Sequence, residues 1–232
     1  MRMKKVLIIA GIVAVAIGVF FFIEDGPENG PEAVKTDKFI VVNPIELSQI
    51  ASISQFRSCI GHDYSGKNTE GVKETNRSMK HYLAPIPELE QSTGKVIAIA
   101  PFDGKISSIE DGENQRGDQV WLSSSSSGSW NFIFFHIDLL PELRKGSEVG
   151  SGQLIGYADL EGGANFDFAL KKVGFGGQTL DSPFLYMADE VMAEYEAVGV
   201  TPENIVILKE QRDANPCNFG VGSGHDEQVF LK

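Results

Sequence analysis

The sequence has 232 residues, of which 42% are hydrophobic and 22% charged, and its formal net charge at pH 7 is −12. Nucleic acids and anionic lipid surfaces repel a chain this acidic, so neither is an expected partner. The length is sufficient for one domain with an ordinary hydrophobic core.

A strongly apolar segment without charges covers residues 6–23, with basic residues before it and acidic residues directly after it. A helix of that length just crosses a bilayer, and the charge bias predicts that everything beyond it lies outside. A cleaved signal peptide remains open, because Ala14-Val15-Ala16 has small residues at the spacing of a cleavage site. We therefore expect residues 1–23 to be a transmembrane anchor or signal. The expected location is the cell membrane, with a single pass and the C-terminal domain outside.

Residues 24–38 are rich in proline, glycine and charge, a composition typical of an exposed tether. The folded part, residues 39–232, contains two cysteines, Cys59 and Cys217. In an exported chain an even cysteine count favours a disulfide, and this one would close a very long loop. Two buried free thiols are the alternative, and neither cysteine is expected to bind metal.

Short apolar runs separated by turn residues predict a mainly β domain. Before them, apolar spacing in residues 44–54 predicts a short helix, and residues 56–82 have the composition of an irregular loop. The predicted strands are residues 96–100, 104–109, 119–122, 130–137, 153–158 and 166–170, with a serine-rich hairpin turn at 123–129. After them a helix is predicted from Pro183 to Val198, ending at Gly199, and residues 204–208 are predicted to form a strand.

Three segments carry a recognisable pattern: Ala-Pro-Phe-Asp-Gly-Lys-Ile at 100–106, Phe-Phe-His-Ile-Asp at 134–138, and a glycine-punctuated run at 146–158. In order and spacing they resemble the lysostaphin-type zinc endopeptidases, which cut peptide bridges in bacterial cell walls. The resemblance covers about residues 77–170. It implies a small antiparallel β barrel or sandwich of the lysostaphin-like, duplicated hybrid motif kind. A C-terminal helix and strand extension, residues 181–232, lies outside it.

The resemblance also implies where zinc would bind, and the chain departs from the family there. The family's ligands are an H-x-x-x-D pair ahead of an Ala-Pro dipeptide and the second histidine of a late H-x-H. Here Arg77 and His81 stand at the first two positions, and Asp167 stands at the third. A zinc site needs converging imidazoles and a carboxylate, whichever positions supply them, so His62, His81 and Asp167 form a candidate set of rearranged metal ligands.

Two further residues are candidates for catalysis through the same resemblance. His136 matches a family histidine that assists the zinc-bound water, work suited to a group that titrates near neutral pH. Asn165 replaces the other catalytic histidine. Its amide can donate a hydrogen bond but cannot shuttle protons, so any surviving hydrolysis would be slow.

Two interpretations of the altered site follow. In the first, metal binding has been lost and the domain binds a peptide or a protein partner in the cell envelope. Arg77 favours this loss, because a guanidinium repels a dication unless Glu74 or Asp63 neutralises it. In the second, the chain is a zinc metalloendopeptidase with rearranged ligands. We expect the binding role, because three altered ligand positions arise more easily by loss than by coordinated exchange.

A carrier domain of the biotinyl or lipoyl kind shares part of the sequence pattern. Such a domain needs a modifiable lysine at a hairpin tip soon after the second glycine-rich segment. Tyr157-Ala158-Asp159-Leu160 offers none, so this class is not expected.

Overall fold

The computed structural model describes residues 37–112, 116–163, 166–219 and 226–232. The predicted anchor, most of the predicted tether and Asn165 lie outside the described residues. Among the helices that are described, none is both long and apolar enough to cross a membrane. Residues 31–232 group into one unit by their contacts.

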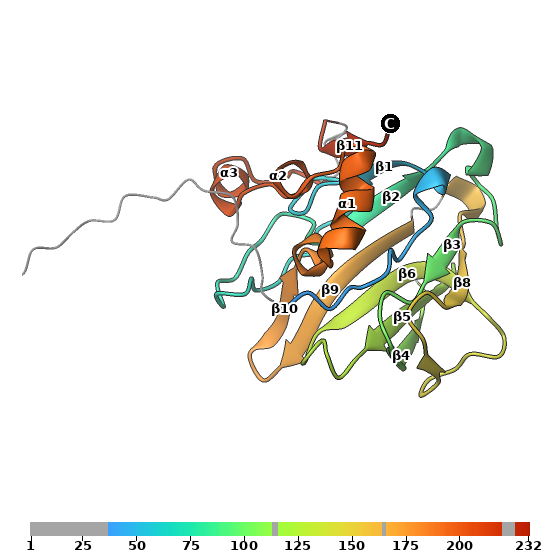
Figure 1. Cartoon of the computed structure of the whole chain (residues 1–232). Helices are drawn as coiled ribbons and strands as arrows, with labels where there is room; N and C mark the ends of the chain where they lie inside the picture. The colour runs from blue at the N-terminus through green and yellow to red at the C-terminus, as the bar shows by residue number, and fades with distance from the viewer. Residues whose placement is uncertain (1–36, 113–115, 164–165, 220–225) are drawn as a thin grey trace, which may run out of the picture. The chain divides into compact units, whose positions relative to one another are not determined.

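One antiparallel sheet organises this unit (Figure 1). Its strands are β1 (Ile50–Ser54), β2 (His81–Pro85), β3 (Ile97–Ile99), β4 (Gly104–Asp111), β5 (Asp118–Ser123), β6 (Asn131–Leu139), β7 (Glu148–Val149), β8 (Leu154–Ala158), β9 (Phe166–Gly174), β10 (Gly177–Asp181) and β11 (Gln228–Phe230). The order is β11-β1-β2-β9-β6-β5-β4-β7, while β10 pairs with β9 and β8 joins β6 to β3. All these pairings are antiparallel, which confirms the predicted mainly β, antiparallel class.

The strands predicted from apolar runs are all present, as β3, β4, β5, β6, β8 and β9, and the serine-rich turn joins β5 to β6. The predicted helix at residues 44–54 is wrong. Only Leu47–Gln49 forms a single 3-10 turn, and Ile50–Ser54 is strand β1. Strand β1 lies between β2 and β11, both distant in sequence, so its backbone partners are invisible to local apolar spacing.

The C-terminal extension consists of η5 (Pro183–Tyr186), α1 (Asp189–Ala197), α2 (Pro202–Ile205) and α3 (Lys209–Ala214), followed by β11. The long helix predicted from Pro183 is interrupted at Met187, which is extended. The cause is tertiary, because Ile40 exchanges backbone hydrogen bonds with the residues on either side of Met187.

The sequence prediction is confirmed for the end of that helix and wrong for the segment after it. The predicted stop at Gly199 is confirmed, and its φ of 92° is a conformation that suits glycine. The predicted strand at residues 204–208 is wrong. Asn204 accepts a hydrogen bond from the Thr201 amide at 2.8 Å and so helps to begin helix α2.

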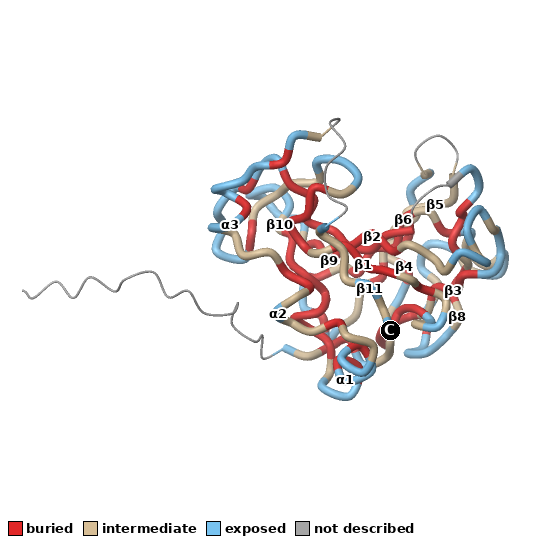
Figure 2. Tube along the Cα trace, turned by 90° about the horizontal axis from the view of Figure 1, so that it is seen from above, coloured by how far each residue is buried: buried red, intermediate tan, exposed pale blue. Residues whose placement is uncertain are grey.

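Apolar side chains cover both faces of the sheet. In β6, Phe132 and Phe134 face the main core, whereas Ile133 and Phe135 face the other side. Burial on both sides explains why this strand is a continuous apolar run, and in Figure 2 the central strands are largely buried. We call the second side the Asp167 face, because Asp167 pairs with Phe135 there. It is covered by the segment that precedes β2.

Candidate functional site

The predicted ligand His81 lies on the main-core side of the sheet. In the register between β2 and β9, His81 is opposite Phe168, whereas Tyr82 is opposite Asp167. Since successive side chains of a strand point to opposite faces, His81 and Asp167 project to opposite sides. The structure therefore does not bring the predicted ligand set of His62, His81 and Asp167 together.

Both ring nitrogens of His81 have partners in the core. Nδ1 donates to the carbonyl oxygen of Ser54 at 2.7 Å, and Nε2 accepts from the hydroxyl of Ser182 at 2.9 Å. The buried ring also packs against Phe168 and Phe184. Burial lowers the pKa of His81 to about 4, although the bond to Ser54 opposes this. His81 is thus a neutral core residue that ties β2 to β1 and η5.

This burial predicts an acid sensitivity that His81→Gln should partly remove. The pKa of about 4 in the folded state lies below the ordinary value of 6.5, so between these values the unfolded chain binds the extra proton. Above pH 6.5 His81 is neutral in both states and does not change the free energy of unfolding. As the pH falls from 6.5 to 4, proton uptake by the unfolded chain lowers that free energy by about 3 kcal/mol in total. Urea denaturation at neutral and acid pH measures the loss. If the wild type and His81→Gln lost the same free energy of unfolding on acidification, this account would be contradicted.

Asp167 is paired with an ammonium group. The carboxylate is fully buried, and Nζ of Lys80 lies 2.5 Å from its Oδ2. The same ammonium lies 4.9 Å from the ring centres of Tyr64 and Tyr82 and 4.2 Å from that of Phe135, within the range of cation–π contacts. Burial raises the pKa of Asp167, and the charge of Lys80 acts in the opposite direction. The carboxylate therefore already has a counter-ion within the chain.

His136 approaches the same carboxylate from a bulge in β6. The register between β5 and β6 shifts here, and His136 has a left-handed φ of 59°. Nδ1 donates to the carbonyl oxygen of Arg116 at 3.1 Å, and Nε2 lies 3.8 Å from Oδ1 of Asp167. The side chain is 23% exposed, so it is a partly accessible neighbour of a buried carboxylate. Unusual backbone conformations of this kind concentrate at functional positions.

Gly117 supports this bulge. A Cβ at Gly117 would lie 2.7 Å from the carbonyl carbon of His136, so only glycine allows the two backbones to approach this closely.

His62 lies at the exposed edge of the Asp167 face. Its Nδ1 bonds to the carbonyl oxygen of Asp63 at 3.1 Å. Its ring meets those of Tyr64 and Tyr82 edge-on, with centroids 6.2 and 6.5 Å apart. When it is protonated, its charge lowers the pKa of Asp167. His62 therefore belongs to the surroundings of Asp167, but as a solvent-facing residue.

Sequence reasoning misses Lys80 because it treats residues 56–82 as a loop. The available signal is the alternation in Lys80-His81-Tyr82. In a strand this order places Lys80 and Tyr82 on one face and His81 on the other. A shift of one position along the strand, from His81 to Lys80, thus decides which side chain reaches Asp167.

Lys171 and Trp121 extend the Asp167 face along β9 and β5. The ammonium of Lys171 lies 4.4 Å from the ring centre of Trp121 and 5.4 Å from that of Tyr64. Burial lowers the pKa of Lys171. Within the described residues, the indole nitrogen of Trp121 and the hydroxyl of Tyr64 are buried without a hydrogen-bond partner. These polar groups lie beside the apolar surface of Ile133 and Phe135.

The charge of Arg77 is neutralised by neighbours. Its Nη1 lies 2.8 Å from Glu74 and its Nη2 lies 2.5 Å from Asp213. Arg57 shares the buried Glu74 carboxylate, also at 2.8 Å. Glu74 is one of the two acids that the sequence offered as a counter-ion, so Arg77 by itself is no obstacle to a cation on the Asp167 face.

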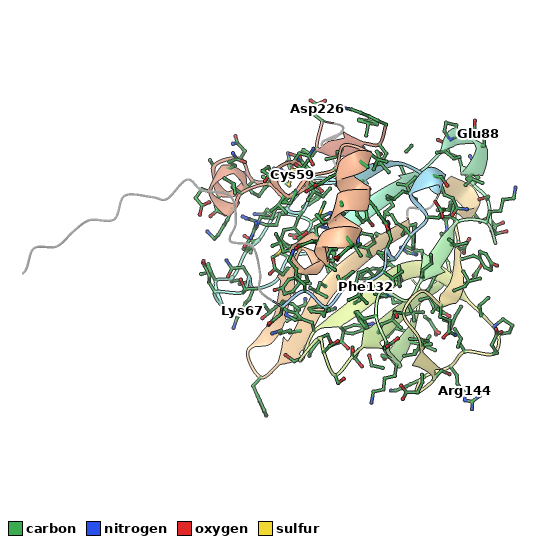
Figure 3. All side chains as sticks on the ribbon, viewed as in Figure 1. Cys59, Lys67, Glu88, Phe132, Arg144 and Asp226 are labelled. Carbon is green, nitrogen blue, oxygen red and sulfur yellow. A yellow bond between two sulfur atoms is a disulfide. The ribbon has the colours of Figure 1, made fainter. Side chains whose placement is uncertain are left out.

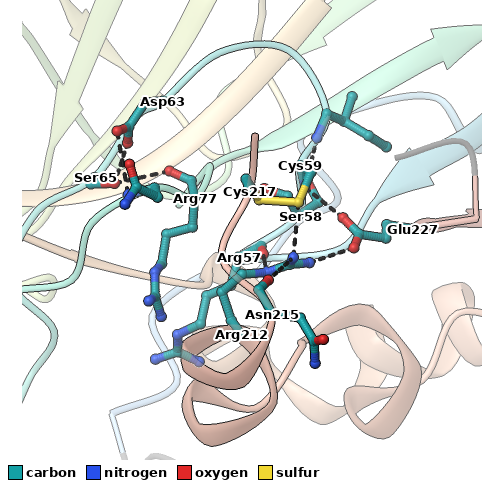
Figure 4. The surroundings of a disulfide bond; sticks show 12 residues. Arg57, Ser58, Cys59, Asp63, Ser65, Arg77, Arg212, Asn215, Cys217 and Glu227 are labelled. Carbon is teal, nitrogen blue, oxygen red and sulfur yellow. Dashed lines mark hydrogen bonds and ion pairs between the residues drawn. A yellow bond between two sulfur atoms is a disulfide. The ribbon is translucent and has the colours of Figure 1, made fainter. Parts of the chain in front are cut away.

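A disulfide joins Cys59 to Cys217, which confirms the predicted pairing (Figure 4). Arg212 lies beside it and donates from Nε to the carbonyl oxygen of Arg57 at 2.6 Å. Arg212 also forms an ion pair with Glu227, which accepts a hydrogen bond from the amide of Cys59. These links tie the C-terminal extension to the segment that covers the Asp167 face.

No protein-family model matches the sequence, and a search of curated proteins finds no match. Solved structures do match. The catalytic domain of lysostaphin from Staphylococcus simulans is 17% identical over 50% of this chain and 80% of that chain, with a TM-score of 0.34. The chain resembles lysostaphin-type peptidases. A Csd3 structure from Helicobacter pylori is 15% identical over 83% of this chain and 45% of that chain, with a TM-score of 0.41.

A third match is the SpoIIQ-SpoIIIAH pore-forming complex, 15% identical over 70% of this chain and 99% of that chain, with a TM-score of 0.44. The chain spans less than half of two other matched proteins: 44% of the LytM structure from Ruminococcus gnavus and 32% of a second Csd3 structure.

The donors around Asp167 do not fit the zinc ion that the resemblance implies. Zinc needs its protein ligands within about 2.0–2.3 Å of one point. His81 faces the other side of the sheet, and Lys80 holds Asp167. Within the part of the chain that is described, no three His, Cys, Asp or Glu residues are grouped to hold a metal ion.

Proposed function

We propose that this is a peptidase-like domain of the cell envelope that binds a peptide or a protein partner at the exposed edge of its Asp167 face, beside His62, and does not depend on zinc. The observation that carries the proposal is the ion pair between Lys80 and Asp167. A metal ion at Asp167 would have to displace an ammonium group that three aromatic rings also stabilise. Breaking a buried pair leaves one charge uncompensated, which is costly.

The residues around that ion pair support recognition. Tyr64, Trp121 and His136 are partly exposed, and His62 is exposed. Aromatic side chains are enriched at the centres of binding interfaces.

The proposal also places the domain outside the cell membrane, held by the apolar segment at residues 6–23. The charge bias around that segment supports this orientation.

Metal content tests the proposal against the zinc peptidase alternative. After dialysis, the purified full chain should contain far less than one zinc per molecule, because Asp167 is paired and His81 faces the core. Added zinc should leave the melting temperature unchanged, both in the wild type and in Asp167→Asn. One tightly bound zinc per chain, lost in Asp167→Asn, together with release of peptide from cell-wall material, would establish the peptidase instead.

Site-specific photo-crosslinking in the producing cells tests the binding role. A photoreactive residue in place of His62, at the edge of the Asp167 face, should form an adduct of defined mass. The matched control is Glu203 in helix α2, an exposed residue elsewhere on the domain. Equal adducts from both positions, or none from His62, would contradict binding at this face.

A further inference from the structure

Three of the five large hydrophobic side chains that are exposed in the described residues gather at one end of the domain. Val173 and Phe175 lie in the β9–β10 hairpin, whose last pair is Gly174 with Gly177. Val72 lies in the neighbouring turn. Phe175 is 117% exposed, so its ring makes almost no contact with the rest of the chain. Figure 1 shows this hairpin extending beyond its neighbouring strands.

The two turns lie side by side. The amide of Lys67 donates to the carbonyl oxygen of Gln178 at 3.1 Å, and the amide of Leu180 donates to the carbonyl oxygen of Lys67 at 2.8 Å. Lys67 also pairs with Lys73 across the turn that contains Val72. In Figure 3 the labelled Lys67 lies beside the hairpin. The exposed apolar groups therefore lie on two neighbouring turns, which we together call the hairpin tip (residues 67–73 and 172–178).

This surface is basic in an acidic chain. Its charged residues are Lys67, Lys73 and Lys172 against the single acid Glu70, whereas the whole chain carries −12. None of the three lysines forms an ion pair within the described residues. Lys172 lies over the ring of Trp130. The rest of the chain's negative charge acts weakly here, because salt screens charges beyond about 8–10 Å.

We propose that the hairpin tip docks onto an anionic phospholipid surface, with Phe175 in the interfacial layer and the three lysines against the headgroups. An aromatic ring on a projecting turn with ammonium groups around it suits a bilayer interface, where apolar groups insert and cations meet phosphates. The negative charge of the whole chain argues against such a surface, but the charge at this tip has the opposite sign. The inference goes beyond the peptide-binding role and uses none of its residues.

The contact is weak by itself and suits a chain that is already close to a membrane. Each lysine near an anionic leaflet strengthens binding about fivefold. One aromatic ring and three lysines give reversible binding, and a second attachment is needed for stable association. A short tether supplies it by raising the effective concentration of the tip at the membrane.

Hydrogen exchange of the full chain in lipid nanodiscs tests this inference. The amides of residues 174–177 should exchange severalfold more slowly in discs of phosphatidylglycerol than in discs of phosphatidylcholine. Phe175→Ser should abolish the difference, and replacing the three lysines by glutamine should reduce it strongly. Phe175→Ser should fold normally, because the ring is exposed; an unchanged melting temperature checks this.

Phe230→Ser is the matched control, because Phe230 is 66% exposed on β11 and lies outside the hairpin tip. It should leave the protection of residues 174–177 unchanged. Equal exchange in both lipids would overturn the inference. So would protection in a zwitterionic detergent as strong as in phosphatidylglycerol, since that would remove the dependence on anionic headgroups.

Discussion

Replacing Cys59 and Cys217 together by serine should lower the free energy of unfolding by about 5 kcal/mol. The disulfide joins residues 158 positions apart, so it removes much conformational freedom from the unfolded chain. In the native state its loss removes the covalent link between the C-terminal extension and the segment that covers the Asp167 face. Denaturant unfolding of both proteins measures the difference.

The wild type measured in reductant is the control for the disulfide prediction. It should unfold at the same denaturant concentration as the double serine variant, since both lack only the cross-link. A double variant as stable as the oxidised wild type would show that Arg212 and Glu227 hold this region without the disulfide.

Lys80→Met should cost about 3–5 kcal/mol, because it leaves Asp167 buried and unpaired. The loss should be smaller at acid pH. Burial raises the pKa of Asp167, and without Lys80 the carboxyl group would take up a proton more readily in the folded state. The double variant Lys80→Met/Asp167→Leu should recover most of the stability, since it removes both charges. Chemical denaturation of the single and double variants gives the coupling energy.

Lys145→Met is the matched control for this cycle, because Lys145 is exposed in a turn. It should change stability by less than about 0.5 kcal/mol. If Lys80→Met were equally harmless, the buried ion pair would not exist in solution, and the proposed metal-independent role would lose the observation on which it rests.

The sequence alone predicts six strands of the sheet, β3, β4, β5, β6, β8 and β9, and the disulfide. Continuous apolar runs such as Phe132–Phe135 predict buried strands because they have few other stable arrangements. Cys59 and Cys217 are the two cysteines of the sequence, so a disulfide within the chain has one possible pairing. Strand β1 and the break at Met187 depend on hydrogen bonds to distant segments, and local spacing carries no information about those.

The site was decided by tertiary structure. By the resemblance, spacing to the Ala-Pro dipeptide places His81 at a ligand position. The β2–β9 register then turns His81 into the core and presents Lys80 to Asp167. Side chains in a strand alternate with a period of two, so a shift of one residue moves a group to the other face. The sequence thus placed His81 at a ligand position without predicting strand β2, and only the paired sheet determined which side chain of this segment reaches Asp167.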